Sequence, residues 1–288
     1  MSPIDPTLSI AAVELAVSDL SRSIDFYERI LGLPLIDRDQ HRARLGGDPA
    51  HPALILTDIV GASPLPPNST GLFHVAWLHP SRSSLADSVR RVAGARWPLE
   101  GASDHGVSEA LYLSDPDGLG IEIYVDRPRE QWERPADGGG VAMYTLPLDL
   151  DDLLAQSTGE PTAAVAPGTG IGHVHLKVAN VPRASAFYRD ALGFEEQAQL
   201  PSAAFVSAGG YHHHVGLNSW QSHGGAPAPD SAPGLRRVEF ALTEDGALDE
   251  IERALADASS SPAPGVRDQD GAVSVSDPDG QLLRFARR

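Results

Sequence analysis

The residues of this chain best suited to chemistry are three consecutive histidines, His212, His213 and His214. They follow a Gly-Gly-Tyr turn (209–211) and lead into an apolar Val-Gly-Leu segment (215–217), which favours a buried strand over a polar tail. Neutral imidazole is the commonest metal ligand, and its burial without a partner is unfavourable. Because strand side chains alternate between faces, we predict His212 and His214 on one face and His213 on the other. A polar surface strand or a loop is the alternative interpretation.

Other strands must bring further ligands to this run, and the sequence contains the same strand-helix pattern twice. Residues 8–17 alternate as a strand, residues 21–31 have helical spacing, and Gly32 ends the helix. Strand-like pieces follow at 33–37, 42–45 and 53–57. The pattern returns at residues 171–194 with a constant offset of 161 (174 − 13 and 192 − 31). A repeat that keeps one offset through strand, helix and turn, without insertion or deletion, indicates internal duplication.

The later parts of each copy repeat as well. Each contains a predicted helix, at 81–95 or 246–256, and then an Asp-Pro-Asp-Gly turn, at 115–118 or 277–280, before a final strand. The sequence therefore predicts four strand-helix-strands modules, at 8–60, 70–126, 170–220 and 234–288. We expect two domains, 8–126 and 170–288, joined by a connector at 127–169 that carries a short helix near 149–155.

Length and charge limit the classes of protein. A chain of 288 residues suggests two domains of ordinary size. The net charge of −17 argues against nucleic acid or an anionic membrane as a partner. Without cysteine the chain has no disulfide, thiolate ligand or cysteine nucleophile. No apolar run is long enough for a membrane span and no signal peptide is evident, so we expect a soluble cytoplasmic protein.

The turn-helix pattern and the two Asp-Pro-Asp-Gly strands resemble the vicinal oxygen chelate superfamily. That superfamily includes glyoxalase I, extradiol ring-cleaving dioxygenases and bleomycin-resistance proteins. Several stretches are more similar to two-domain, catechol-2,3-dioxygenase-like bacterial proteins, namely 72–74, 80–82, 101–113, 120–124, 126–128, 172–176 and 210–214. The resemblance implies an α+β fold, in which four βαβββ modules form two cupped, barrel-like β-sheets with helices outside.

The resemblance also implies two metal-ligand positions in each module, one in the first strand and one in the last. Carried through the repeat, it gives eight positions: Ala12, Ala53, His74, Glu122, His173, His214, Arg237 and Arg284. Alanine cannot coordinate a metal and arginine stays protonated, so the competent positions all lie in modules two and three.

We predict that modules two and three share one barrel and that His74, Glu122, His173 and His214 bind the metal. Three of these, with the glutamate included, give the two-histidine, one-carboxylate set of non-haem Fe(II) oxygenases. This pairing departs from the common extradiol enzymes, in which the resemblance implies an iron site within the last two modules.

Alternatives remain at several positions. His175 shares a strand face with His173, and His212 shares the predicted face of His214, so each could replace its neighbour as a ligand. His74 could be an edge histidine and Glu122 a solvent-facing residue. His175, His212 and His105 are the candidate acid-base catalysts, although His105 could equally be a turn residue.

The function that the resemblance implies is a metal-dependent extradiol-type dioxygenase, cleaving the ring of a catechol or hydroquinone-like aromatic with O2. The expected cofactor is a divalent metal, Fe(II) first, with Mn, Zn or Ni as alternatives. A glyoxalase-type isomerase or lyase is the second hypothesis, and a non-catalytic binding protein of the bleomycin-resistance type is the third. The partners expected are small molecules, with a homodimer left open.

Overall fold

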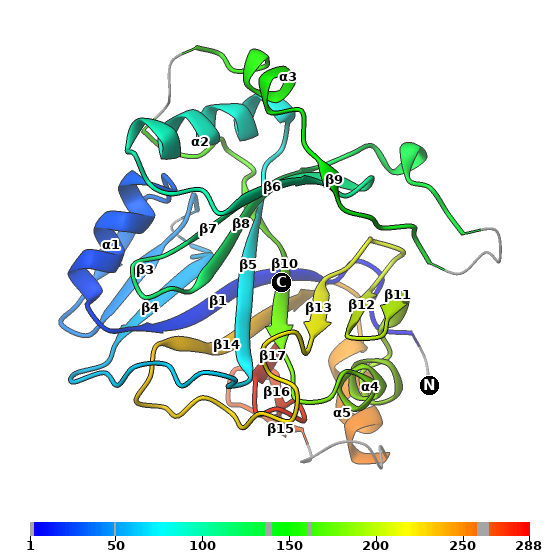
Figure 1. Cartoon of the computed structure of the whole chain (residues 1–288). Helices are drawn as coiled ribbons and strands as arrows, with labels where there is room; N and C mark the ends of the chain where they lie inside the picture. Colours follow the sequence, from blue (N-terminus) through cyan, green and yellow to red (C-terminus); the bar gives the residue numbers. More distant parts are fainter. Residues whose placement is uncertain (1–2, 49, 136–139, 160–162, 258–264) are drawn as a thin grey trace.

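The computed structural model describes residues 3–48, 50–135, 140–159, 163–257 and 265–288. Its strands form two mixed sheets with the helices outside them (Figure 1), which confirms the predicted α+β fold of two cupped sheets. Helices α1 and α2 lie at one side of the molecule, and α4 and α5 lie at the opposite side. No helix in the described ranges is long and apolar enough to span a membrane.

Modules one and four build the eight-stranded sheet. Its centre is the antiparallel pair β1 (Ser9–Val17) and β14 (Gly234–Leu242). On either side follow β4 (Leu54–Asp58), β3 (Arg42–Leu45), β2 (Leu35–Arg38), β17 (Leu282–Arg287), β16 (Val273–Ser276) and β15 (Val266–Arg267).

Modules two and three, with β9 from the connector, build the nine-stranded sheet around the antiparallel pair β5 (Gly71–Leu78) and β10 (Gly170–Lys177). The other strands are β8 (Gly120–Asp126), β7 (Ser108–Ser114), β6 (Gly101–Asp104), β9 (Leu146–Pro147), β13 (Val215–Asn218), β12 (Ala203–Ser207) and β11 (Glu195–Leu200). The predicted pairing of modules two and three is therefore present within one chain. Each half of the sequence contributes strands to both sheets.

Polar caps begin the helices that flank the sheets. Asp19 caps α1 (Leu20–Arg29), Ser81 caps α2 (Arg82–Gly94) and Asn180 caps α4 (Val181–Ala186), each by accepting a backbone N–H of the first turn. In the third module α4 continues as one π-helical turn, η2 (Phe187–Ala191). The remaining helices are α3 (Leu150–Ala155) in the connector, the short η1 (Arg129–Gln131) and α5 (Ala247–Asp257).

The Asp-Pro-Asp-Gly turns join helices to strands by the same contacts in both halves. Asp115 accepts backbone N–H groups of Asp117 and Leu119, and the Tyr27 hydroxyl lies 3.2 Å from its other oxygen. Asp277 makes the same contacts in the second half. It accepts two backbone N–H groups, and the Tyr188 hydroxyl lies 3.2 Å from its other oxygen. Each tyrosine belongs to the module before its aspartate, so these contacts tie consecutive modules together.

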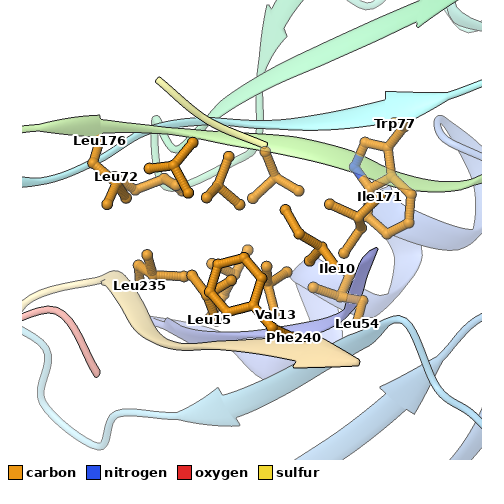
Figure 2. Close-up of a cluster of buried hydrophobic side chains, with 14 of the residues drawn as sticks. Ile10, Val13, Leu15, Leu54, Leu72, Trp77, Ile171, Leu176, Leu235 and Phe240 are labelled. Carbon is orange, nitrogen blue, oxygen red and sulfur yellow. The ribbon is translucent and has the colours of Figure 1, made fainter. Parts of the chain in front are cut away.

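The main hydrophobic core lies between the two sheets (Figure 2). Leu176 and Trp77 reach it from one sheet, and Val13 and Phe240 from the other. Alternation along β10 therefore sends Val174 and Leu176 into the core and leaves His173, His175 and Lys177 for the opposite face.

Candidate metal centre

Three buried side chains from three neighbouring strands converge on the outer face of the nine-stranded sheet. They are His74 of β5, Glu122 of β8 and His173 of β10. Nε2 of His74 lies 2.9 Å, and Nε2 of His173 lies 3.2 Å, from the same oxygen, Oε2 of Glu122. Their ligand atoms all lie within 4.8 Å of one another. Sheet geometry thus brings together residues that are 48 positions apart or more in the sequence (122 − 74 = 48 and 173 − 122 = 51).

This donor set fits a divalent metal ion. Although Nε2 of His74 is close to Glu122, within the described residues it is a buried atom without a hydrogen bond of acceptable geometry. A buried polar atom left in this way is unfavourable unless something else occupies it. Two imidazoles and one carboxylate are the ligand set of non-haem iron oxygenases, and they also suit manganese or zinc.

The protonation states at the centre also suit metal binding. Burial lowers the pKa of His173 to about 4, although the nearby Glu122 opposes the shift. Burial by itself would raise the pKa of Glu122, but His173 and His74 outweigh it and hold that pKa well below its usual range. Near neutral pH Glu122 is therefore an ionised carboxylate and His173 a neutral imidazole, and these are the forms that coordinate metals.

The three residues line a cavity of about 580 Å³. Its walls are largely apolar, with Phe73, Leu119, Ile121, Leu200, Phe205 and Trp220 among them. Leu200 and Trp220 are about half exposed, at 53% and 51%, so they stand where the cavity meets solvent. A concave apolar pocket with a few convergent polar groups is typical of a small-molecule site.

Two of the predicted catalytic histidines also line this cavity. The ring centroid of His175 lies 5.0 Å from that of His74, and its Nε2 has no hydrogen bond within the described residues. Burial lowers the pKa of His175 well below its usual range, so its imidazole is neutral. His105 contacts the Tyr112 hydroxyl at 2.7 Å through Nε2 and the Tyr144 carbonyl oxygen at 2.8 Å through Nδ1.

The histidine run itself is placed differently from the prediction. Strand β13 begins only at Val215, and the three histidines precede it in a loop that starts with Gly209 and Gly210, both at positive φ. Strict alternation therefore does not apply to them, and the placement of the run inside a strand was wrong.

Each histidine of the run has its own surroundings. His213 lines the cavity, with its ring centroid 4.1 Å from that of His173. His212 is buried behind it, with Nδ1 2.8 Å from His213 Nδ1 and Nε2 2.9 Å from Asp126 Oδ1. His214 points elsewhere: its Nδ1 accepts the Ala208 N–H at 3.1 Å, and its ring borders a separate pocket of about 320 Å³. The structure thus brings His74, Glu122 and His173 together but not His214.

His213 is the one histidine among the described cavity-lining residues that the sequence did not predict at the site. His173, His212 and His213 also have ligand atoms within 4.8 Å of one another, so they form a second group that shares His173 with the first. The Gly-Gly pair before the run is the sequence feature that could have indicated the direction of His213. Two glycines favour a turn, and such a turn changes the strand register.

Comparison with known proteins agrees with this geometry. The model of the Glyoxalase/Bleomycin resistance protein/Dioxygenase superfamily matches residues 9–123 and 170–285. The chain belongs to this superfamily. It is 38% identical over 289 residues to a catechol-2,3-dioxygenase of Bacillus subtilis (strain 168), with 99% of each chain covered.

Solved structures show the superfamily fold. A putative dioxygenase from Bacillus subtilis subsp. subtilis str. 168 has a TM-score of 0.66 at 15% identity, covering 100% of this chain and 86% of the other. Glyoxalase I from Zea mays has a TM-score of 0.59 at 16% identity, covering 97% and 92%. At these identities the likeness concerns the fold alone.

The other sheet of this superfamily fold carries ion pairs at the equivalent positions. Arg237 contacts Glu14 at 3.0 Å, and Arg284 contacts Glu239 at 3.0 Å and Asp268 at 3.0 Å. Arg237 and Arg284 stand where the repeat places His74 and Glu122 in the nine-stranded sheet. The eight-stranded sheet thus uses these positions for paired charges.

Proposed function

We propose that the protein is an extradiol-type ring-cleaving dioxygenase that acts on a catechol or hydroquinone-like aromatic with O2 as co-substrate. The observation that carries the proposal is the convergence of His74, Glu122 and His173 at a largely apolar cavity. The identity of 38% to a catechol-2,3-dioxygenase along essentially the whole chain supports it.

The proposed ligands of a divalent metal, Fe(II) first, are His74, Glu122 and His173. This group is favoured over His173, His212 and His213 because it contains a carboxylate and because all its members line the cavity. His212, in contrast, is held between Asp126 and His213. A ferrous ion would supply Lewis acidity toward vicinal substrate oxygens and the redox chemistry that O2 requires.

The chain's own residues would handle the substrate protons. Neutral imidazoles of His175 and His213 line the cavity, and burial lowers the pKa of each well below its usual range. Either ring can accept a proton from a substrate hydroxyl and return it later as a general acid. His105 and Tyr112, hydrogen-bonded to each other, provide a second polar contact in the same cavity.

The apolar walls would orient the ring and exclude water. Phe73 packs edge-on against both His175 and Trp220, with each pair of ring centroids 5.3 Å apart. An aromatic substrate can pack against these rings while its polar oxygens face Glu122 and the histidines. Water exclusion also strengthens the electrostatic interactions at the reacting atoms.

The test combines metal analysis with O2 uptake. We expect anaerobically purified protein to contain iron, to consume O2 with catechols and to form the coloured ring-cleavage product. Glu122→Gln should lower metal affinity by at least roughly tenfold, a loss typical even of residues that only support a ligand. Glu14→Gln, in the other sheet, is the matched control. Bound metal without O2 uptake on any catechol would refute the proposal in favour of isomerase or lyase chemistry.

A further inference from the structure

Lys177 is the only lysine in the sequence, since the other 21 of the 22 basic residues are arginines. It is the last residue of β10 and lies on the same strand face as His173 and His175. Among the described residues that line the cavity, it is the one lysine or arginine. The solitary lysine of the chain thus stands within the candidate site.

The fold does not require a lysine here. The internal repeat places Ala16 at the equivalent position of β1 (16 + 161 = 177). The register is also equivalent, because Ala16 pairs with Gly234 and Lys177 pairs with Gly71. Ala16 is buried in its sheet, whereas Lys177 reaches the cavity. The lysine is therefore a feature of the cavity and not of the strand pairing.

The ammonium group of Lys177 has no counter-charge within the described residues. No ion pair of Lys177 is present there, and burial is the sole cause that lowers the pKa of Lys177, with no contribution from a carboxylate. The arginines of the other sheet differ, since Arg237 and Arg284 each contact carboxylates. A half-buried cation beside apolar walls is unfavourable until an anion accompanies it.

The surroundings of Lys177 leave room for a ligand group. A Cβ added at its neighbour Gly71 would meet no atom within 4 Å, so the strand beside the lysine borders open space. Lys177 lies two positions beyond His175 in β10, a step of roughly 7 Å along a strand. An aromatic ring held near His74 and Glu122 could therefore extend a short side chain toward the ammonium group.

We propose that Lys177 is a specificity-determining residue that binds an anionic side chain of the substrate, so that the preferred substrates are catechols bearing a carboxylate. This inference rests on the proposed function for the ring chemistry. It explains why one cation is present in a cavity of a chain whose net charge is −17, because that charge would otherwise repel an anionic substrate.

Kinetics on matched substrates provide the first test. Catechols carrying a carboxylate on side chains of zero to three carbons are compared with their methyl esters. We expect the wild type to prefer one acid over its ester, and Lys177→Met to lower kcat/KM for that acid by roughly 10- to 100-fold while leaving the ester unchanged. Lys177→Arg should restore most of the preference. Arg253→Met, at an exposed position of α5, controls for surface charge.

Chemical labelling provides a second test that needs no turnover. Because Lys177 is the only lysine, an amine-acylating reagent has one side-chain target, and the α-amino terminus serves as internal reference. In the holoenzyme kept anaerobic, the preferred acid should protect Lys177 from labelling, whereas its ester should not. Mass spectrometry of the peptide containing residue 177 measures the protection.

The outcomes separate the two proposals. If no catechol is cleaved, the proposed function fails, and labelling alone then decides whether Lys177 binds the carboxylate. If catechols are cleaved but acids and esters are equivalent, or Lys177→Met keeps the preference, the inference is overturned. Labelling at full rate in the presence of the acid would likewise show a lysine that only extends to solvent.

Discussion

His213 and His214 are neighbours in the chain, yet their rings serve different pockets. We expect His213→Leu to keep the metal and lower kcat by roughly 10²- to 10⁴-fold, because the cavity loses a candidate acid-base group. His214→Leu should keep both metal and activity, with a cost only in stability from the lost Ala208 contact. Metal content and steady-state rates of the two variants measure this. Loss of metal in His213→Leu would favour the second ligand group.

At the residue scale the sequence predicts much of the site. His74, Glu122 and His173 followed from the repeat and the family resemblance, and the structure places their ligand atoms together. Their role as ligands stays a prediction. Strand alternation alone did not select His213, because its direction depends on two left-handed glycines that delay the strand until Val215. Sequence alternation carries no information about where a strand starts.

At the scale of elements, the Asp-Pro-Asp-Gly turns make stability depend on pH. Burial raises the pKa of Asp277 to about 6, although backbone N–H groups partly oppose it. The folded protein therefore binds a proton that the unfolded chain releases near pH 4, and this contribution is lost as pH rises from 4 to 7. A shift of this size corresponds to roughly 3 kcal/mol.

Asp277→Asn tests that turn. The amide oxygen can still accept the N–H groups of Asp279 and Gln281, and the variant cannot ionise. The free energy of unfolding of the wild type relative to the variant should therefore fall as pH rises from 4 to 7. Denaturant titrations at several pH values give this difference. A difference that stays constant would show that Asp277 titrates normally.

The sequence predicted which helices and strands form, but not the irregularities within them. The expected strand at 42–45 and helices at 21–31, 81–95 and 246–256 correspond to β3, α1, α2 and α5 within about two residues. The π-helical turn at Phe187–Ala191 has no counterpart in the first copy, where α1 is regular through Arg29. Both copies carry Phe-Tyr, so that motif does not cause the difference.

At the scale of the molecule, each sheet takes one module from each half of the sequence. Splitting the chain near Gly139, which lies outside the described residues, should therefore give two halves that are poorly soluble and free of metal when expressed alone. Each would expose the edges of central strands, β1 and β5 in one half and β10 and β14 in the other. Sedimentation and metal analysis measure this.

Co-expression of the two halves is the matched control, because it should restore a soluble, metal-loaded complex. A stable fragment 170–288 that retains metal by itself would contradict the pairing. It would also show that the expected domains, 8–126 and 170–288, fold as separate units.

The pairing of β1 with β14 also concerns synthesis on the ribosome. Ser9 lies opposite Ala241, so the eight-stranded sheet cannot close until nearly the whole chain has emerged. At typical translation rates the 216 residues between Val17 and Gly234 (residues 18–233) take roughly 10 to 40 s to add. During that interval the nascent first half carries an unpaired apolar strand edge. We therefore expect this protein to depend on ribosome-associated chaperones more than proteins whose sheets close within one half of the chain.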